Sequence, residues 1–347
     1  MSLLDSMSTS APISVAKRVP RARRAEAVTP AIRLEIQPLP RWARSQGADP
    51  GAAAFSAGAG LALFDQILRG ADGGEPVYAG CLRQRLALRA ADSCATLARL
   101  REDAGALRDA EHLPGGGETS PAGRLHRVFR LYAPQGGRFD AAILRAAELL
   151  EVSVAIDASA LAAAAVTAPD PLMAAARASA AAMKPFPIAA DAEVFAFVVA
   201  DLALASRLAW ARPIPLLAVA ILHPSLRRGA GSGEMGRERT SRPRPTDDNW
   251  AESVARAYGR AVVEAHALAV DLARRAQKVL AVAPMLRAKG AGRVVEMLLA
   301  DDAVTPAAAA SHAGLSDRAA RRLFDRLVAL GAARELTGRE TFRIYGL

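Results

Sequence analysis

The C-terminal stretch, residues 289–347, decides the fold. It reads KGAGRVVEMLLADDAVTPAAAASHAGLSDRAARRLFDRLVALGAARELTGRETFRIYGL. The pattern predicts a helix over 290–300, a short helix opened by Thr305 and Pro306, a turn at Gly314, a longer helix capped by Ser316, a stop at Gly331, and strands over 334–336 and 341–345 that meet at Thr337 and Gly338. The predicted order is helix, helix, turn, helix and hairpin, which is the layout of a winged helix-turn-helix.

The helix that follows Ser316 is predicted to have two different faces. Ser316 is a good N-cap because its hydroxyl accepts a hydrogen bond from an unpaired N–H of the first turn. Apolar residues recur at spacings of three and four, namely Ala320, Leu323, Phe324, Leu327 and Leu330. The other side carries Arg318, Arg321 and Arg322, with Arg326 at its margin and Asp325 offsetting part of the charge. One face is therefore predicted core and the other a basic surface.

The basic surface predicts contact with double-stranded DNA. In helix-turn-helix proteins the second helix enters the major groove, and the planar fork of an arginine matches guanine edges and phosphate oxygens. We expect contacts from Ser316, Arg318, Arg321, Arg322, Arg326, Arg339 and Arg343, the last two on the hairpin wing. On the second strand, Phe342 and Ile344 are expected on one face, with Thr341, Arg343 and Tyr345 on the other.

Two other interpretations of this stretch stay open. It fits a small cap whose basic face is only solvated, because arginine-bearing helix faces commonly serve that role. It also fits a winged helix that contacts another protein. Steep salt dependence distinguishes DNA binding from an apolar protein contact, since DNA binding releases counterions.

Composition and charge indicate the fold class of the rest of the chain and the kind of partner it suits. The 347 residues are rich in Ala and Leu and only 5% aromatic, which predicts a mainly α, multi-helix body before the winged helix-turn-helix-like subdomain. The net charge of +10 is uneven: basic residues exceed acidic ones by eight to three in 1–46, six to two in 225–246, and ten to seven in 285–347. Such a distribution suits a polyanionic partner.

These signals divide the chain into five parts. We expect a disordered basic tail over 1–47, a helical body over 48–223, a flexible basic loop over 224–247, a long helix joining the body over 248–284, and the winged helix-turn-helix-like domain over 285–347. The apolar face of the long helix makes it either the spine of the body or, over 248–283, the seam of a homodimer.

Several classes of protein are disfavoured. Cys81 and Cys94 lie about 20 Å apart on one predicted helix, so they are expected to be free thiols in a reducing cytoplasm. No signal peptide is evident, and the apolar 194–222 region is too interrupted to span a membrane. The triple glycine at 115–117 lacks the phosphate-loop pattern. Histidines 112, 126, 223, 266 and 312 are scattered, so we expect no metal, cofactor or catalytic site, and no enzyme.

Several segments resemble a known family. They are Cys81 to Leu88, Ala106 to Ala110, Pro121 to Arg124, Arg212 to Ala218, Ala281 to Gly292, Arg321 to Leu327, and Arg339 to Leu347. Together they resemble an uncharacterised bacterial family, domain of unknown function 1403, over about Pro40 to Leu347. The resemblance implies membership but brings no known activity.

The chain's ending has a second resemblance. Leu336 to Arg339, with Phe342 and Arg343, is similar to the C-terminal helix-turn-helix of other bacterial proteins thought to bind DNA. The sequence departs from that pattern at 307–310, which are all alanine.

Taken together, the sequence predicts a cytoplasmic, regulatory DNA-binding protein with a helical body for self-association or ligand sensing. The alternative is a non-catalytic interaction protein whose winged end docks a partner. An enzyme with an unrecognised helical active site ranks third.

Overall fold

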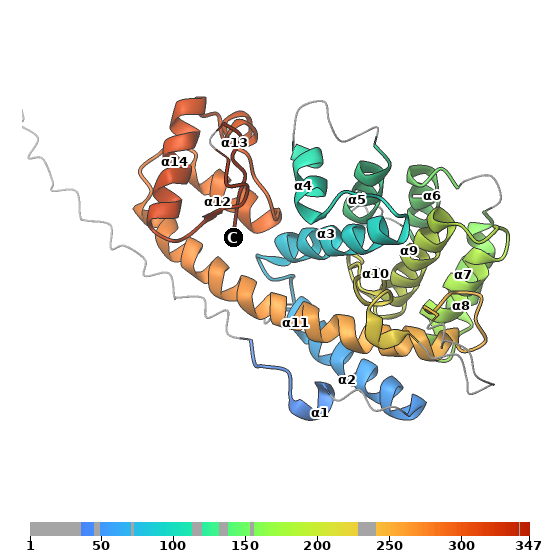
Figure 1. The fold of residues 1–347 in the computed structure, drawn as a ribbon. Coiled ribbons are helices and arrows are strands. Elements are labelled where there is room, and N and C mark those ends of the chain that lie inside the picture. The colour runs from blue at the N-terminus through green and yellow to red at the C-terminus, as the bar shows by residue number, and fades with distance from the viewer. Residues whose placement is uncertain are drawn as a thin grey trace, which may run out of the picture. The chain divides into compact units, whose positions relative to one another are not determined.

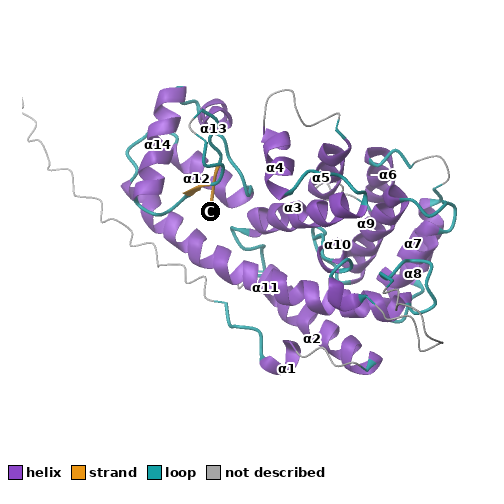
Figure 2. Cartoon of the chain, in the orientation of Figure 1, coloured by secondary structure: helices purple, strands orange, loops and turns teal. Residues whose placement is uncertain are grey.

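The computed structural model describes residues 36–44, 49–70, 73–112, 120–131, 138–152, 156–227, 241–339 and 341–347 (Figure 1). Helices account for most of these residues, and the strands described lie near the C-terminus (Figure 2). The predicted mainly α fold class is confirmed, including the short C-terminal hairpin.

The chain forms a helical body followed by a smaller C-terminal subdomain. The body contains α1 (Arg41–Arg44), α2 (Pro50–Leu68), α3 (Ala79–Leu97), α4 (Ala104–His112), α5 (Pro121–Leu131), α6 (Phe139–Leu149), α7 (Ala158–Val166), α8 (Pro171–Met183), α9 (Ala190–Arg207), α10 (Leu217–Ala220), the 3-10 turn η2 (Pro224–Leu226) and α11 (Trp250–Val282). After the 3-10 turn η3 (Ala283–Met285), the C-terminal subdomain, residues 286–347, contains α12 (Ala291–Ala300), α13 (Pro306–Ala313), α14 (Asp317–Ala329), β1 (Arg334–Glu335) and β2 (Tyr345–Gly346).

Helix α9 is the centre of the body. Every residue from Ala192 to Ala205 is buried, as expected for a helix that is apolar on nearly all sides. Its main packing partners are α8, α6 and α10. Asp201 in the middle of α9 is buried, and its carboxylate accepts hydrogen bonds from the N–H groups of Leu216 and Leu217 and from the Tyr258 hydroxyl. This one side chain therefore links α9 to α10 and α11.

Helix α11 is the spine of the body. Its buried face packs against α2, α8, α10 and α3 of the same chain. At its start, Trp250 donates a hydrogen bond from Nε1 to Ser179 Oγ at 2.9 Å. Near its middle, Val262 approaches α2 so closely that a Cβ on Gly60 would lie 3.0 Å from it. The glycine in α2 thus permits close helix packing.

The N-terminal boundary of the body was predicted too late in the chain. Residues 36–44, assigned to the disordered tail, include α1, and Leu39 and Ala43 are buried. Ile36, Leu39 and Ala43 recur at spacings of three and four, a periodicity too short to stand out beside the polar residues around it. The rest of the predicted tail, 1–35 and 45–47, lies outside the described residues.

The ends of the predicted flexible loop are structured. Pro224–Leu226 forms η2, and residue 241 onwards packs onto the body. The Arg242 guanidinium forms a two-pronged ion pair with Glu193 on α9, whose carboxylate is buried. The prediction of flexibility is wrong at these ends because the carboxylate that holds Arg242 is far away in sequence. Residues 228–240 lie outside the described residues.

One described helix, α2, is long and apolar enough to cross a membrane by length and composition alone, which is weak evidence. Its buried face packs on α11, and Asp65 near its end accepts a hydrogen bond from Trp210 Nε1. On α3, Cys81 and Cys94 are buried free thiols, as predicted.

Local capping builds the C-terminal subdomain as the sequence predicts. The Thr305 hydroxyl accepts from Ala308 N–H at the start of α13, and the Ser316 hydroxyl accepts from Ala319 N–H at the start of α14. Gly314, in the turn between the two helices, and Gly331, after α14, both have a left-handed backbone. The predicted sequence of helix, helix, turn, helix and hairpin is present.

The hairpin is shorter than predicted. β1 and β2 are antiparallel, with Arg334 opposite Gly346 and Glu335 opposite Tyr345. Residues 341–344 are not strand, so the expected alternation of faces is wrong: Ile344 and Tyr345 are both buried. Tyr345 also exchanges backbone hydrogen bonds with Val304, which precedes α13. Its backbone is therefore paired on both sides and its ring is drawn into the core.

Candidate nucleic-acid interface

The exposed face of α14 carries the predicted arginines. Arg318, Arg321, Arg322 and Arg326 are all exposed, and none of the four guanidinium groups has a hydrogen bond or ion pair to another described residue. The opposite face buries Ala320, Leu323, Phe324 and Leu327. The main packing partners of α14 are α13 and β1. Together with α12, these elements lie at one end of α11 (Figure 1). The structure brings these arginines together on one surface.

Two further cations lie near the start of α14. Gly290, with a left-handed backbone, sits so close to the end of α13 that a Cβ there would be 2.7 Å from the Ala313 carbonyl oxygen. This close approach puts the first turn of α12 beside the turn that leads into α14. Lys289 and Arg293 are exposed in that region. Neither was predicted from the sequence, because their position depends on how α12 packs on α13.

A groove of mixed charge lies between the start of α13, α14 and residues 341–345. It has a volume of about 320 Å³. Arg321 and Arg343 line it, but so do Asp317 and Asp325. Arg343 lies 4.0 Å from the Asp325 carboxylate, and hydrogen bonding to Tyr345 raises the pKa of Arg343. The predicted contact residues Arg321 on α14 and Arg343 near the hairpin therefore line the same groove, although Asp317 and Asp325 offset part of their charge.

The arginine at the hairpin tip is engaged elsewhere. Arg339 Nη2 lies 2.8 Å from Asp109 Oδ2 on α4, and Arg108 Nη2 donates to the Leu336 carbonyl at 3.1 Å. These two interactions hold the hairpin on the body. The predicted DNA contact of Arg339 must therefore compete with an intramolecular ion pair.

Arg339→Ala is expected to loosen the hairpin locally. A partly exposed ion pair contributes about 1 kcal/mol, so amides of 336–339 and 341–345 should exchange hydrogen about fivefold faster. Hydrogen exchange followed by mass spectrometry measures this change. Arg322→Ala is the control, because Arg322 is an exposed arginine of the same subdomain without a partner among the described residues, and its loss should change exchange in this segment little. Equal exchange in the Arg339 variant and the unmodified protein would contradict the role given to this ion pair.

A buried charge cluster joins the C-terminal subdomain to the body. Arg130 on α5 lies 2.8 Å from Asp301 and 3.2 Å from Asp302, just after α12, and 3.7 Å from Glu111 on α4. Burial and the neighbouring Asp301 raise the pKa of Asp302 to about 7. Burial opposes ionisation of Asp301, yet the positive charge of Arg130 keeps the pKa of Asp301 below its usual range.

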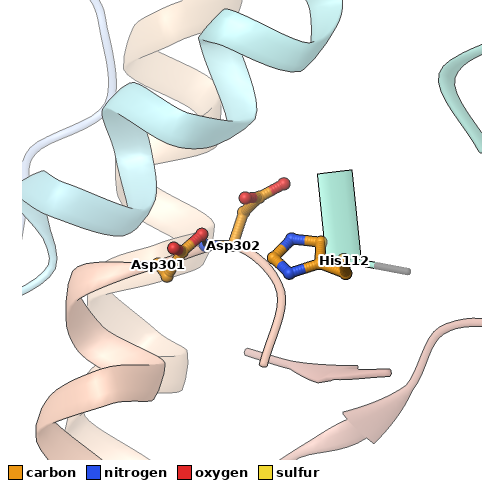
Figure 3. A group of neighbouring side chains, drawn as sticks. All are labelled: His112, Asp301 and Asp302. Atoms are coloured by element: carbon orange, nitrogen blue, oxygen red, sulfur yellow. Dashed lines mark hydrogen bonds between the residues drawn. The ribbon is translucent and has the colours of Figure 1, made fainter. Parts of the chain in front are cut away.

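His112, at the end of α4, lies beside the two carboxylates (Figure 3). Potential ligand atoms of His112, Asp301 and Asp302 all lie within 4.8 Å of one another, and His112 Nε2 is buried without a partner among the described residues. Burial lowers the pKa of His112, which favours the neutral ring. This grouping was not foreseen from the sequence, because His112 is remote from the two aspartates along the chain. Arg130 already supplies positive charge to both carboxylates, so a metal ion would have to compete with it.

The fold and this surface define a mainly helical protein with a basic helix face in its C-terminal subdomain. The chain belongs to the family described as protein of unknown function (DUF1403), whose model matches residues 26–347. The predicted family resemblance is confirmed. No curated protein matches the chain.

Proposed function

We propose that the protein binds double-stranded DNA through its C-terminal subdomain, used as a winged helix-turn-helix with α14 as the recognition helix. The observation that carries the proposal is the set of four exposed arginines on α14 without partners among the described residues. The proposed role is regulatory, with the helical body serving self-association or ligand sensing.

The spacing of the arginines suits a groove. Arg318, Arg322 and Arg326 are separated by four residues each, so they rise along α14 in steps of about 6 Å. The row is therefore about 12 Å long, comparable with the width of the major groove. Arg321 flanks the row, and Lys289 and Arg293 are positioned to meet the phosphates of the adjoining backbone. Arginine serves both tasks because its fork binds guanine edges and phosphate oxygens.

The second candidate function is docking of a protein partner. The groove beside α14 supports it, since Asp317 and Asp325 next to Arg321 would repel a uniformly anionic ligand but suit a mixed-charge peptide. The two functions differ in the steepness of their salt dependence, because neutralising phosphates releases condensed counterions, whereas salt only screens the few ion pairs of a mixed-charge peptide.

The test is a fluorescence titration of the full chain against genomic DNA fragments at several salt concentrations. We expect the triple variant Arg318→Ala/Arg321→Ala/Arg322→Ala to bind at least tenfold more weakly at low salt. Its slope of log affinity against log salt should fall by about one for each phosphate that is no longer neutralised. The core positions and the Ser316 cap are untouched, so the fold should survive.

The matched control is the triple variant Arg89→Ala/Arg177→Ala/Arg227→Ala. These arginines are also exposed and without partners among the described residues, but they belong to the body. Both variants have the same net charge. If only the α14 variant binds DNA more weakly, the loss is due to the α14 surface and not to the lower total charge. Equal binding by the two variants would reject groove binding by α14.

A further inference from the structure

We propose that a pocket between α3, α5, residues 212–215 and the end of α12 binds a small oxyanion that carries its own hydrogen-bond donor. The pocket has a volume of about 110 Å³. Its polar lining consists of Arg83, Gln84, Arg130 and Arg212. No carboxylate is found among the described residues that line it, so its charge favours an anion.

Arg212 is the free cation of the pocket. It is half-buried and has no hydrogen bond or ion pair to another described residue. Pro213 and Pro215 follow it and restrict the backbone that carries it. Because the Arg212 side chain is partly shielded from water and its backbone is restricted, it can bind an anion with little loss of conformational entropy.

The other two arginines are neutralised from outside the pocket. Arg83 is paired with Glu75, and Arg130, whose side chain is 8% exposed, is paired with Asp301 and Asp302. These carboxylates are not among the lining residues. Both guanidinium groups are therefore held in place, and Arg83 keeps one N–H, that of Nε, without a partner among the described residues.

Unsatisfied atoms define what the ligand must offer. Arg83 Nε and Gln84 Oε1 are buried and have no hydrogen-bond partner among the described residues. Nε–H needs an acceptor and Oε1 needs a donor. Hydrogen phosphate or a small hydroxycarboxylate supplies an anionic oxygen and a hydroxyl together, whereas sulfate at neutral pH has no donor.

The volume limits the size of the ligand. One water needs about 10–15 Å³ of such space, so the pocket holds the equivalent of several waters. This is the scale of phosphate or a three-carbon acid and is too small for a nucleotide.

The pocket lies where the body meets the C-terminal subdomain. Gly80 on α3 and Ala300 at the end of α12 both line it, and a Cβ on Gly80 would lie 2.5 Å from the Ala300 carbonyl oxygen. A bound anion would thus touch both parts of the chain where they approach each other closely. Binding at this site does not depend on the proposed DNA binding and is measured without DNA.

The experiment is isothermal calorimetry of the full chain in phosphate-free buffer, with inorganic phosphate, lactate and sulfate as probes. We expect saturable binding of phosphate or lactate, and the stronger of the two identifies the oxyanion class. Sulfate should bind at least several-fold more weakly than the stronger of these two probes. Equal affinity for sulfate would overturn the role given to Gln84, and no binding of any probe would overturn the proposal.

Two variants locate the site. Arg212→Ala should weaken binding about tenfold or more, as expected for a charge-assisted hydrogen bond, and Gln84→Glu should abolish it by placing a carboxylate in the pocket. Arg89→Ala, an exposed arginine on the same helix α3, is the control and should bind normally. If Arg212→Ala and Arg89→Ala bind alike, the anion is held elsewhere and the proposal fails.

Discussion

Phe324→Ala is expected to lower the free energy of unfolding of the C-terminal subdomain by about 3–5 kcal/mol, the range for removing a buried aromatic side chain. Phe324 is fully buried on α14, and its ring stacks on Tyr345 with centroids 4.4 Å apart and planes 10° apart. The backbone of Tyr345 pairs with both Val304 and Glu335. The cavity would therefore weaken the helix and the sheet together.

Chemical denaturation followed by circular dichroism measures this decrease. Val328→Ala is the matched control, because Val328 is on the same helix but exposed and should change stability by about 0.5 kcal/mol or less. An unfolding midpoint that is the same for Phe324→Ala and Val328→Ala would contradict the packing described for α14.

Arg242→Ala is expected to destabilise the body by about 3–5 kcal/mol, because it leaves the buried Glu193 carboxylate without its cation. Thermal unfolding of the full chain measures the effect. Arg244→Ala, a nearby exposed arginine whose side chain has no partner among the described residues, should be nearly neutral.

The double variant Glu193→Leu/Arg242→Met shows whether that destabilisation comes from the unpaired Glu193 charge or from lost packing of the Arg242 stem. Replacing a buried ion pair by apolar side chains is commonly neutral or stabilising, so the double variant should recover most of the stability. If it is as unstable as Arg242→Ala, packing of the arginine stem rather than the unpaired charge is responsible.

The sequence predicted the features that depend on neighbouring residues. Thr305 and Ser316 cap helices through bonds to N–H groups three residues ahead. Gly314 ends α13 through its own backbone conformation. The face of α14 follows from the spacing of Phe324 and Leu327. Each of these signals acts within one helical turn, so it is visible in a single sequence.

Features that depend on distant residues could not be predicted in the same way. Arg339 was assigned to DNA because nothing near it in sequence marks Asp109 as its partner. Arg130 and Asp302 likewise meet only after the body has folded. The basic face of α14 was predictable, but the nearby Lys289 and Arg293 were not, because their position depends on how α12 packs on α13.

The second strand was predicted too long for a related reason. Phe342 and Ile344 have high strand propensity, whereas pairing with both Val304 and β1 begins only at Tyr345. Propensity is a property of each residue alone, but a strand also needs a partner backbone, and the partner is set by the folded subdomain.

The uninterrupted length of α11 has a mechanical consequence. Its 33 residues span about 50 Å, with no proline to bend them. Contacts with α2 and α8 hold its first half, where Val262 meets Gly60 and Trp250 meets Ser179, and the far end leads through η3 and residues 286–290 into α12. Because the first half is held, the free arm is about 25 Å long, and a tilt of about 5° displaces its end by about 2 Å. A displacement at the far end would strain the ion pairs of Arg130 and Arg339 that hold the C-terminal subdomain on the body, so α11 and these ion pairs act as separate ties between the two parts.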